Sequence, residues 1–306
     1  MTRSILIAGP TAAGKTALAL HAAQVLDGEI INADSMQIYD GLHLITARPD
    51  ASETTQAPHH LFGSVDPSKR WSVGEWSLAA LDLIQEIKAR GKTPILVGGT
   101  GLYFLSLTQG LAPVPEIDAA SRKRTENLIE TEGLEGLRRE ADRLDPVSAQ
   151  RIEPADAQRL QRVVEVGYAT GEALSDFHKQ TQAPLEVDAW TGVIIDPDRQ
   201  KLYQRIEDRF DSMMKQGALE EVDAFAKRGL DPLLPAMKAL GIPPLMTHLR
   251  GEMDLEDAIS LSKRDSRRYA KRQLTWFRNQ HADWNRIDSL DPKIAQSQLE
   301  GILSND

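Results

Sequence analysis

Residues 9–16 read GPTAAGKT and match the phosphate-loop pattern G-x-x-x-x-G-K-[ST], which constrains the fold more than any other segment. The apolar run at residues 4–8 predicts a buried strand before this loop, and residues 16–23 predict the start of a helix after it. A glycine-rich turn between strand and helix directs backbone N–H groups toward one point at the positive end of the helix dipole. Lys15 would add a charge and Thr16 a hydroxyl for Mg²⁺. The motif therefore predicts a site for a di- or triphosphate, and a tight turn without a ligand is the alternative.

The composition is that of an ordinary globular protein and excludes several kinds of chemistry. Because none of the 306 residues is a cysteine, the chain has no disulfide, no thiolate zinc site and no cysteine nucleophile. No apolar run approaches the length of a membrane span, and the first core strand begins almost at once. We therefore expect a cytoplasmic protein without a membrane contact. The net charge of −9 argues against general affinity for nucleic acid but leaves room for a local basic groove.

Strand-like and helical segments alternate along the first third of the chain. Residues 28–34 and 95–97 predict buried strands, and residues 77–89 predict a helix between them. Such alternation predicts an α/β fold, in which helices flank a parallel sheet of the phosphate-loop type. Helical patterns replace it between about residues 121 and 179, where Asp156 is a good N-cap.

An all-helical insertion domain is therefore expected inside the α/β core. We place the first part of the core at residues 1–114, the insertion at 115–188, and the second part of the core at 189–306. The residues after position 282 are expected to form a weakly anchored tail.

Asp34 ends the second predicted strand, and ligands of open parallel sheets bind beyond the carboxyl ends of the strands. Its side chain could act as a general base, a Mg²⁺ ligand or a cap of the following turn, and the edge position favours catalysis. The third strand ends in Gly98-Gly99, whereas a nucleotide hydrolase would carry a Mg²⁺-binding Asp there. This weakens the case for an ATPase and favours an enzyme that grips a diphosphate and uses it as a leaving group.

Basic residues cluster despite the acidic total. Arg159 and Arg162 lie three residues apart on a predicted helix and share one face. Residues 263–278 hold seven lysines and arginines with aromatic residues between them. Such density predicts contacts with the phosphates of a nucleic acid, and a solvated charged face is the alternative.

Two further groups of polar residues have more than one interpretation. Arg205 and Arg209 lie among three carboxylates, so the pattern does not decide between structural ion pairs and ligand binding. His59 and His60 lack a third metal ligand nearby in the sequence. We expect a packing or loop role for this pair rather than a metal site.

Seven ordered segments carry a resemblance that covers nearly the whole chain. They are GPTAAGKT (9–16), ADSMQIY (33–39), PHHL (58–61), LVGGTGLY (96–103), DPVSA (145–149), RIEDRF (205–210) and YAKRQLTWF (269–277). With them the chain resembles the bacterial tRNA isopentenyltransferase family, the tRNA dimethylallyltransferases. The resemblance implies transfer of a dimethylallyl group from its diphosphate to N6 of adenine 37, beside the anticodon of tRNA. It also implies that the helical insertion grips the anticodon stem-loop and that the enzyme works as a monomer.

The resemblance assigns roles to individual residues. Asp34 would accept a proton from the N6 amine, Thr11 and Arg209 would complete the catalytic set, and Mg²⁺ would be shared between Thr16 and the phosphate oxygens. The implied diphosphate site comprises Gly9, Pro10, Thr11, Ala12, Ala13, Gly14, Lys15, Thr16 and Arg209. The implied tRNA contacts are Asp34, Ser35, Met36, Gln37, Thr100, Arg122, Gln158, Arg159, Leu160, Gln161, Arg162 and Lys238.

A few positions depart from the family pattern. Ile45 and Arg48 stand where many members have Gly and Lys, and Ile242 replaces a common Tyr. Lys238 replaces an arginine found in some members. An Arg in place of a Lys keeps the charge but changes the geometry of its hydrogen bonds.

Three alternative functions remain open at the level of the sequence. The first is a small-molecule kinase that binds ATP in the same loop. The second is prenylation of free adenine nucleotides, which would leave the insertion and the basic helix without a role. The third is a non-catalytic, nucleotide-gated RNA-binding protein.

Overall fold

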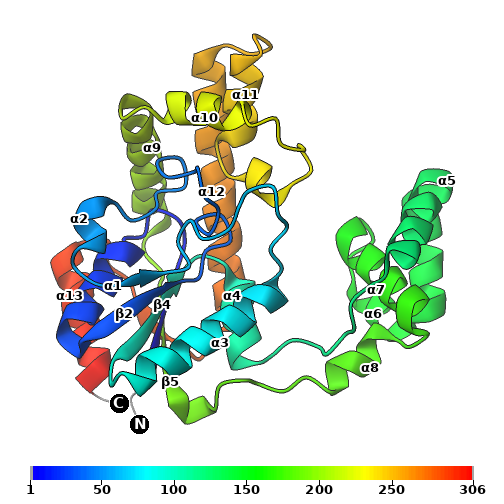
Figure 1. Ribbon diagram of the computed structural model, residues 1–306, viewed down its shortest axis with the longest axis horizontal. Helices are drawn as coiled ribbons and strands as arrows, with labels where there is room; N and C mark the ends of the chain where they lie inside the picture. The colour runs from blue at the N-terminus through cyan, green and yellow to red at the C-terminus, as the bar shows by residue number, and fades with distance from the viewer. Residues whose placement is uncertain (1–2, 305–306) are drawn as a thin grey trace. The chain divides into compact units, whose positions relative to one another are not determined.

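The computed structural model describes residues 3–304 and divides the chain into two compact units (Figure 1). The larger unit is built from two stretches, Met1–Thr108 and Leu185–Asp306, and the smaller unit is Gln109–Pro184. The smaller unit therefore begins and ends somewhat earlier than the predicted insertion at residues 115–188. No helix in the described part of the chain is long and apolar enough to cross a membrane.

A six-stranded sheet forms the centre of the larger unit. The strand order is β3-β2-β4-β1-β5-β6, and every neighbouring pair is parallel. This confirms the predicted fold class. The strands are β1 (Ser4–Ala8), β2 (Gly28–Asn32), β3 (His59–His60), β4 (Thr93–Gly98), β5 (Trp190–Ile195) and β6 (Asn285–Ile287).

Helices surround the sheet on both faces. The helices of the larger unit are α1 (Lys15–Leu26), α2 (Ala51–Thr54), α3 (Val73–Ala89), α4 (Gly101–Thr108), α9 (Arg199–Lys215), α10 (Ala218–Ala226), α11 (Ile242–Leu249), α12 (Leu255–Gln280) and α13 (Pro292–Ser304), with short 3₁₀ turns at Val187–Ala189 and Pro235–Lys238.

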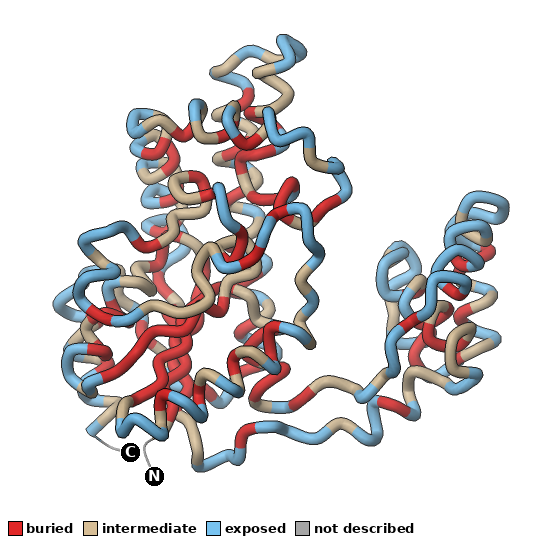
Figure 2. The backbone as a smooth tube through the Cα atoms, in the orientation of Figure 1, coloured by how far each residue is buried: buried red, intermediate tan, exposed pale blue. Residues whose placement is uncertain are grey.

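Alternate residues of each buried strand point to opposite faces of the sheet and so build two cores. In β1, Ile5 and Ile7 join the core formed with α1, α9 and α13, whereas Leu6 and Ala8 join the core formed with α3 and α4. The strands accordingly run as an almost wholly buried band through this unit (Figure 2). Because both faces are covered, the ends of the strands are left to carry the functional site.

The segment after residue 282 is part of the core, so the expectation of a weakly anchored tail is wrong. β6 pairs with β5, and α13 packs against α1. Trp284, Ile287 and Leu299 are all buried. These apolar side chains are sparse in the sequence, but each meets a partner that lies far away in the chain.

The smaller unit is entirely helical, as predicted. Asp156 caps the N-terminus of α7, and Gly171 ends this helix in the left-handed conformation. Asp145, from the DPVSA segment, is fully buried and binds Ser148 and Ser175, which joins α6 to α8. The helices are α5 (Ala119–Leu144), α6 (Pro146–Arg151), α7 (Ala157–Thr170) and α8 (Leu174–Lys179).

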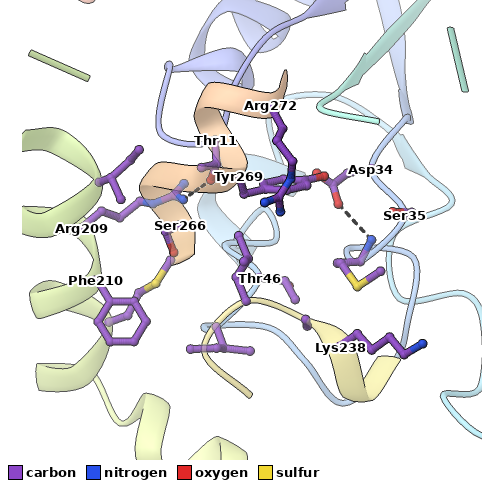
Figure 3. A pocket seen from close by; sticks show the side chains of 16 residues that line it. Thr11, Asp34, Ser35, Thr46, Arg209, Phe210, Lys238, Ser266, Tyr269 and Arg272 are labelled. Atoms are coloured by element: carbon purple, nitrogen blue, oxygen red, sulfur yellow. Dashed lines mark hydrogen bonds between the residues drawn. The ribbon is translucent and has the colours of Figure 1, made fainter. Parts of the chain in front are cut away.

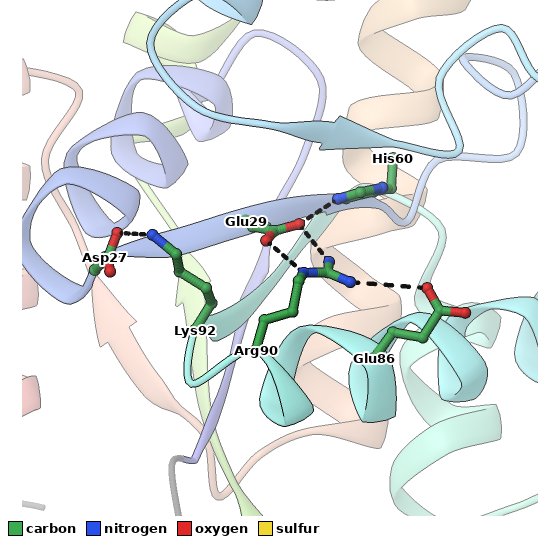
Figure 4. A network of polar contacts seen from close by, with 6 residues as sticks. All are labelled: Asp27, Glu29, His60, Glu86, Arg90 and Lys92. Carbon is green, nitrogen blue, oxygen red and sulfur yellow. Dashed lines mark hydrogen bonds and ion pairs between the residues drawn. The ribbon is translucent and has the colours of Figure 1, made fainter.

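A charged network closes the edge of the sheet where β2 begins (Figure 4). The buried carboxylate of Glu29 accepts hydrogen bonds from Arg90 at the end of α3, at 3.2 and 2.8 Å, and lies 2.7 Å from His60 Nε2 in β3. The Arg90 guanidinium is the main reason why the pKa of Glu29 lies below its ordinary value. The contacts of His60 and the 2.8 Å contact of His59 with the Ala57 carbonyl are packing and loop roles, as expected for this pair.

The Glu29 network makes a prediction about stability and pH. Glu29→Gln is expected to lower the free energy of unfolding at pH 7 by about 1–3 kcal/mol, because a hydrogen-bonded charge pair is lost. Since the folded-state pKa of Glu29 is depressed, its contribution is present above the unfolded-state pKa and is lost as pH falls through the folded-state value. Urea unfolding at several pH values should therefore show the two proteins converging in acid. Glu86→Gln is the matched control, because Glu86 is exposed and lies 4.0 Å from Arg90.

Candidate active site

Residues 9–16 connect β1 to α1, as predicted, and their backbone curls around an open point. Ala12 and Gly14 adopt left-handed conformations, with φ angles of 63° and 87°. Gly14 caps α1 without a side-chain hydrogen bond, so the first N–H groups of the helix have no cap from the protein. Successive N–H groups in such a turn, at the positive end of a helix, form a cradle for an anion.

Lys15 and Arg209 bring two half-buried cations to this cradle. Lys15 Nζ donates a 2.8 Å hydrogen bond to the Pro10 carbonyl. Desolvation lowers the pKa of Lys15 to about 8; the charge of Asp34 raises this pKa, and the charge of Arg209 lowers it further. Desolvation likewise lowers the pKa of Arg209 to about 10. Two poorly solvated cations beside an anion cradle are suited to a phosphorylated ligand.

The contacts of Arg209 favour ligand binding over a structural ion pair. Arg209 Nη2 donates to the hydroxyl of Thr11. Two of the three nearby carboxylates bind α12: Glu207 binds Arg267, and Asp211 lies 2.6 Å from Lys263. The third, Asp208, accepts a 2.8 Å hydrogen bond from Gln204 Nε2 on the same helix. α9 therefore uses Glu207 and Asp211 to hold α12 and directs Arg209 toward the cradle.

Asp34 lies just beyond the carboxyl end of β2, opposite the cradle. Its Oδ1 accepts hydrogen bonds from the Met36 and Gln37 amides, at 2.9 and 3.4 Å. Asn32 holds its backbone on both sides, through Asp34 N and Asp34 O, each at 2.9 Å. Oδ2 has no hydrogen-bond partner among residues 3–304. One oxygen thus caps the turn while the other remains available to accept a proton, so the cap and general-base roles of Asp34 are compatible.

Two cavities meet at these residues. One, of about 600 Å³, is lined by the whole Thr11–Ala17 segment. The other, of about 260 Å³, is lined by polar and apolar side chains of α9, of the Asp34–Met36 turn and of α12, where Tyr269 and Arg272 contribute. They share Thr11, Asp34, Thr46 and Arg209. Figure 3 shows Arg209 directed at Thr11, with Asp34 on the other side of Tyr269 in the view. The arrangement offers one compartment for a phosphorylated donor, one for an acceptor, and reactive groups between them.

Several lining residues were not identified from the sequence, because α12 supplies them from the far end of the chain. Tyr269 and Ser266 face the smaller cavity. Burial, together with the charge of Asp34, raises the pKa of Tyr269, so its hydroxyl keeps its proton. The only available signal was the position of Tyr269 at the start of the YAKRQLTWF segment.

The residues that the resemblance assigns to tRNA in the larger unit gather near Asp34. The Thr100 hydroxyl accepts from the Ser35 amide at 2.9 Å, which fixes the turn after Asp34. Lys238, Ser35 and Met36 line the smaller cavity. The side chain of Gln37 instead donates to two carbonyls of the following loop, Thr46 and Ala47, and lines the larger cavity.

The remaining residues assigned to tRNA lie in the smaller unit, and one of them needs correction. Leu160 is fully buried in the core of that unit, because it occupies the apolar face of α7, so its side chain cannot reach a ligand. Arg159 is exposed beside Asp156, and Arg162 is also exposed, with its pKa lowered by desolvation and by the charge of Arg122. The others are Gln158, which is exposed, and Gln161, which binds Glu165 at 2.8 Å.

The basic run at residues 263–278 does lie on one helix, but much of its charge is neutralised within the protein. Lys263 and Arg267 bind α9, and Arg278 binds Asp196 at 2.7 Å. Arg272 instead stacks over Tyr269 at 5.5 Å and lines the smaller cavity. The structural role of this run is therefore larger than its composition predicted.

The described residues offer Mg²⁺ only part of a coordination shell. No group of three or more His, Cys, Asp or Glu side chains able to hold a metal occurs within residues 3–304. Thr16, Glu53 and Asp208 line the larger cavity and provide oxygen atoms of the kind that Mg²⁺ prefers. This fits a cation held mainly by ligand phosphates and water, with Thr16 as a protein ligand.

An anion cradle beside two cations, an opposing carboxylate and a second compartment define an α/β group-transfer enzyme with a phosphorylated donor. The comparisons identify which one. The model of the IPP transferase family matches residues 37–280. The chain belongs to the IPP transferase family, which confirms the family implied by the sequence motifs.

Individual relatives agree over nearly the whole chain. The tRNA dimethylallyltransferase of Maricaulis maris is 62% identical over 303 residues, which is 99% of this chain and 98% of the relative. The crystal structure of the tRNA isopentenylpyrophosphate transferase of Bacillus halodurans is similar with a TM-score of 0.70 and 35% identity, covering 100% of this chain and 98% of that one. A eukaryotic dimethylallyltransferase acting on tRNA is similar with a TM-score of 0.87 and 28% identity, covering 100% and 79%.

Proposed function

We propose that this protein transfers the dimethylallyl group of dimethylallyl diphosphate to N6 of adenine 37 in tRNA, giving N6-isopentenyladenosine and diphosphate. One observation carries the proposal. The two cavities share Asp34, Thr11 and Arg209, so a proton acceptor faces a site for a leaving diphosphate. A base enclosed in the smaller cavity would have to be extruded from the RNA stack, as other enzymes that act on bases require.

The bonds that change can be assigned to residues. The adenine N6 attacks C1 of the dimethylallyl group, the C1–O bond to the diphosphate breaks, and the N6 proton passes to Asp34. An exocyclic amine is a poor nucleophile unless that proton is accepted. The Thr11 hydroxyl, Lys15 and Arg209 would stabilise the negative charge that grows on the departing diphosphate. Tyr269 keeps its proton and can donate a hydrogen bond within the same space.

We propose Mg²⁺ as the cofactor, with Thr16 as its protein ligand. The ion would neutralise diphosphate charge, and this chain supplies the N–H groups and cations that complete the neutralisation. ATP, which binds loops of the same pattern, is proposed as a competitor for the cradle rather than as a substrate. We propose that the enzyme works as a monomer, because the two cavities share Thr11, Asp34 and Arg209, so this chain alone provides the catalytic set that the family resemblance implies. Its tRNA substrate supports a cytoplasmic location.

The smaller unit is proposed to bind the phosphates of the anticodon stem-loop through Arg122, Arg159 and Arg162. Replacing Arg159 and Arg162 together with alanine is expected to weaken tRNA binding and to reduce the slope of log K against log salt by about 1–2, because two phosphate contacts disappear. Filter binding between low and moderate salt measures the slope.

The double variant Arg139→Ala, Arg143→Ala is the matched control for charge. Both arginines are exposed on the same unit and already pair with Glu132 and Glu140. For this control variant, the slope of log K against log salt should equal that of the unaltered protein. An unchanged slope for the Arg159 and Arg162 variant would show that this face of α7 does not contact phosphate.

The choice of acceptor separates the proposal from prenylation of free nucleotides. The purified protein should be given labelled dimethylallyl diphosphate with either tRNA or AMP. We expect label in the tRNA and none in AMP. Label transferred to AMP at a comparable rate would instead favour a small-molecule acceptor and leave the smaller unit without a role in the reaction.

A further inference from the structure

Gln273 lies on α12, 262 residues from Thr11 in the sequence, yet it contacts the anion cradle directly. Its Oε1 accepts a 2.9 Å hydrogen bond from the Thr11 amide, and its Nε2 donates a 2.9 Å hydrogen bond to the Gly99 carbonyl. The side chain is only 5% exposed. The carboxamide holds an acceptor oxygen and a donor nitrogen on separate atoms at the end of one side chain, so a single glutamine makes both contacts.

The backbone around Gln273 is shaped to admit its amide. A Cβ atom at Gly99 would lie 2.2 Å from Gln273 Nε2 and 3.3 Å from the Gly9 carbonyl. Any larger residue at position 99 would therefore displace the amide. On either side of Gln273, Leu274 and Ala270 are buried in one core and Phe277 in the other, so α12 has little freedom to move the amide away.

Two catalytic segments are connected through this side chain. Thr11 is held at its amide by Gln273 and at its hydroxyl by Arg209. Gly99 immediately precedes Thr100, whose hydroxyl accepts from Ser35 at the turn that follows Asp34. One buried amide thus joins the loop that would hold the diphosphate to the turn that carries the proton acceptor.

We infer that Gln273 is a positioning residue for the transfer reaction: it sets the Thr11 hydroxyl against Asp34 by fixing the cradle to the Gly99–Thr100 turn. It also occupies the Thr11 N–H, so the donor is left with the amides from Ala12 onward. The inference rests on the proposed function and extends it to a residue outside the cavities. A small displacement of the Thr11 hydroxyl is expected to lower kcat while the Kd for tRNA changes little, because the hydroxyl acts on the transition state.

Gln273→Met tests the inference, because methionine has a similar length but makes neither hydrogen bond. We expect kcat to fall by about 10- to 100-fold, while the Kd for tRNA stays within about twofold. Gln273→Glu should also be impaired, since a carboxylate cannot donate to the Gly99 carbonyl. Ser262→Ala is the control: Ser262 is a fully buried polar residue of α12 whose hydroxyl bonds only to its own helix.

A double-mutant cycle distinguishes positioning from a general loss of stability. If Gln273 acts through the Thr11 hydroxyl, Gln273→Met should change kcat by less than about twofold in a Thr11→Ala background. An equal loss in both backgrounds, or full activity of Gln273→Met, would overturn the inference. If Gln273→Met does not fold, Gly99→Ala gives the same test, because it displaces the amide and leaves α12 unchanged. A wild-type protein without activity on tRNA would contradict the proposed function instead.

Discussion

Asp34→Asn is expected to lower kcat by about 10²–10⁴-fold, the range in which a positioned general base contributes. Asparagine is the sharper substitution here, because its Oδ1 can still accept from the Met36 and Gln37 amides and keep the turn intact. What it removes is the carboxylate oxygen that faces the cavities. Single-turnover kinetics with labelled dimethylallyl diphosphate measure the loss, and the Kd for tRNA should change by less than about twofold.

The control for this variant is Asp40→Asn, which removes an exposed carboxylate a few residues further along. It should leave kcat unchanged. If Asp34→Asn kept full activity, Asp34 would serve only as a cap of its turn, and the proton would have to leave by another route.

Arg209→Met is expected to lower kcat by about 10²–10³-fold, because it removes a half-buried donor directed at the charge that develops on the diphosphate. The same substitution should leave a signature in the pH profile. The pKa of Lys15 is about 8, mainly through burial, and the charge of Arg209 contributes to lowering it. The diphosphate is expected to bind the protonated ammonium, so kcat/KM for the donor should fall as pH rises through about 8. Without Arg209 the pKa of Lys15 rises, and this fall should move to higher pH.

Lys201→Met provides the comparison, because Lys201 is an exposed cation on the same helix. It should alter neither kcat nor the alkaline limb. An Arg209→Met enzyme with lower activity but an unchanged alkaline limb would mean that Lys15 does not control donor binding.

The parts of the site that could be predicted from the sequence are those whose geometry is local. The GPTAAGKT turn and the position of Asp34 follow from short patterns, because a buried strand delivers its next residues to the carboxyl edge of a parallel sheet. The N-cap of α7 at Asp156 follows from a local pattern too. Leu160 lies on the buried face of α7, so its side chain cannot be one of the tRNA contacts that the family resemblance implies.

The parts that escaped prediction depend on which distant segments meet. Tyr269 and Gln273 reach the site because α12 packs against α9, α11 and α4. Lys263 and Arg267 bind α9, although their charges predicted a nucleic-acid surface in the sequence. β6 and α13 were predicted to be a weakly anchored tail for the same reason: their partners in the core lie far away in the sequence. Leu299 is unremarkable in its own helix and becomes part of the core only when α1 lies beside it.

Dimethylallyl diphosphate labelled separately in its carbon chain and in its phosphates, incubated with this protein and tRNA, tests the central claim most directly. The carbon label should appear in the RNA, at N6 of the adenine just 3′ of the anticodon, while the phosphate label is released as intact diphosphate. Phosphate label in the RNA, or phosphoryl transfer from ATP to any acceptor without movement of the carbon label, would contradict the account.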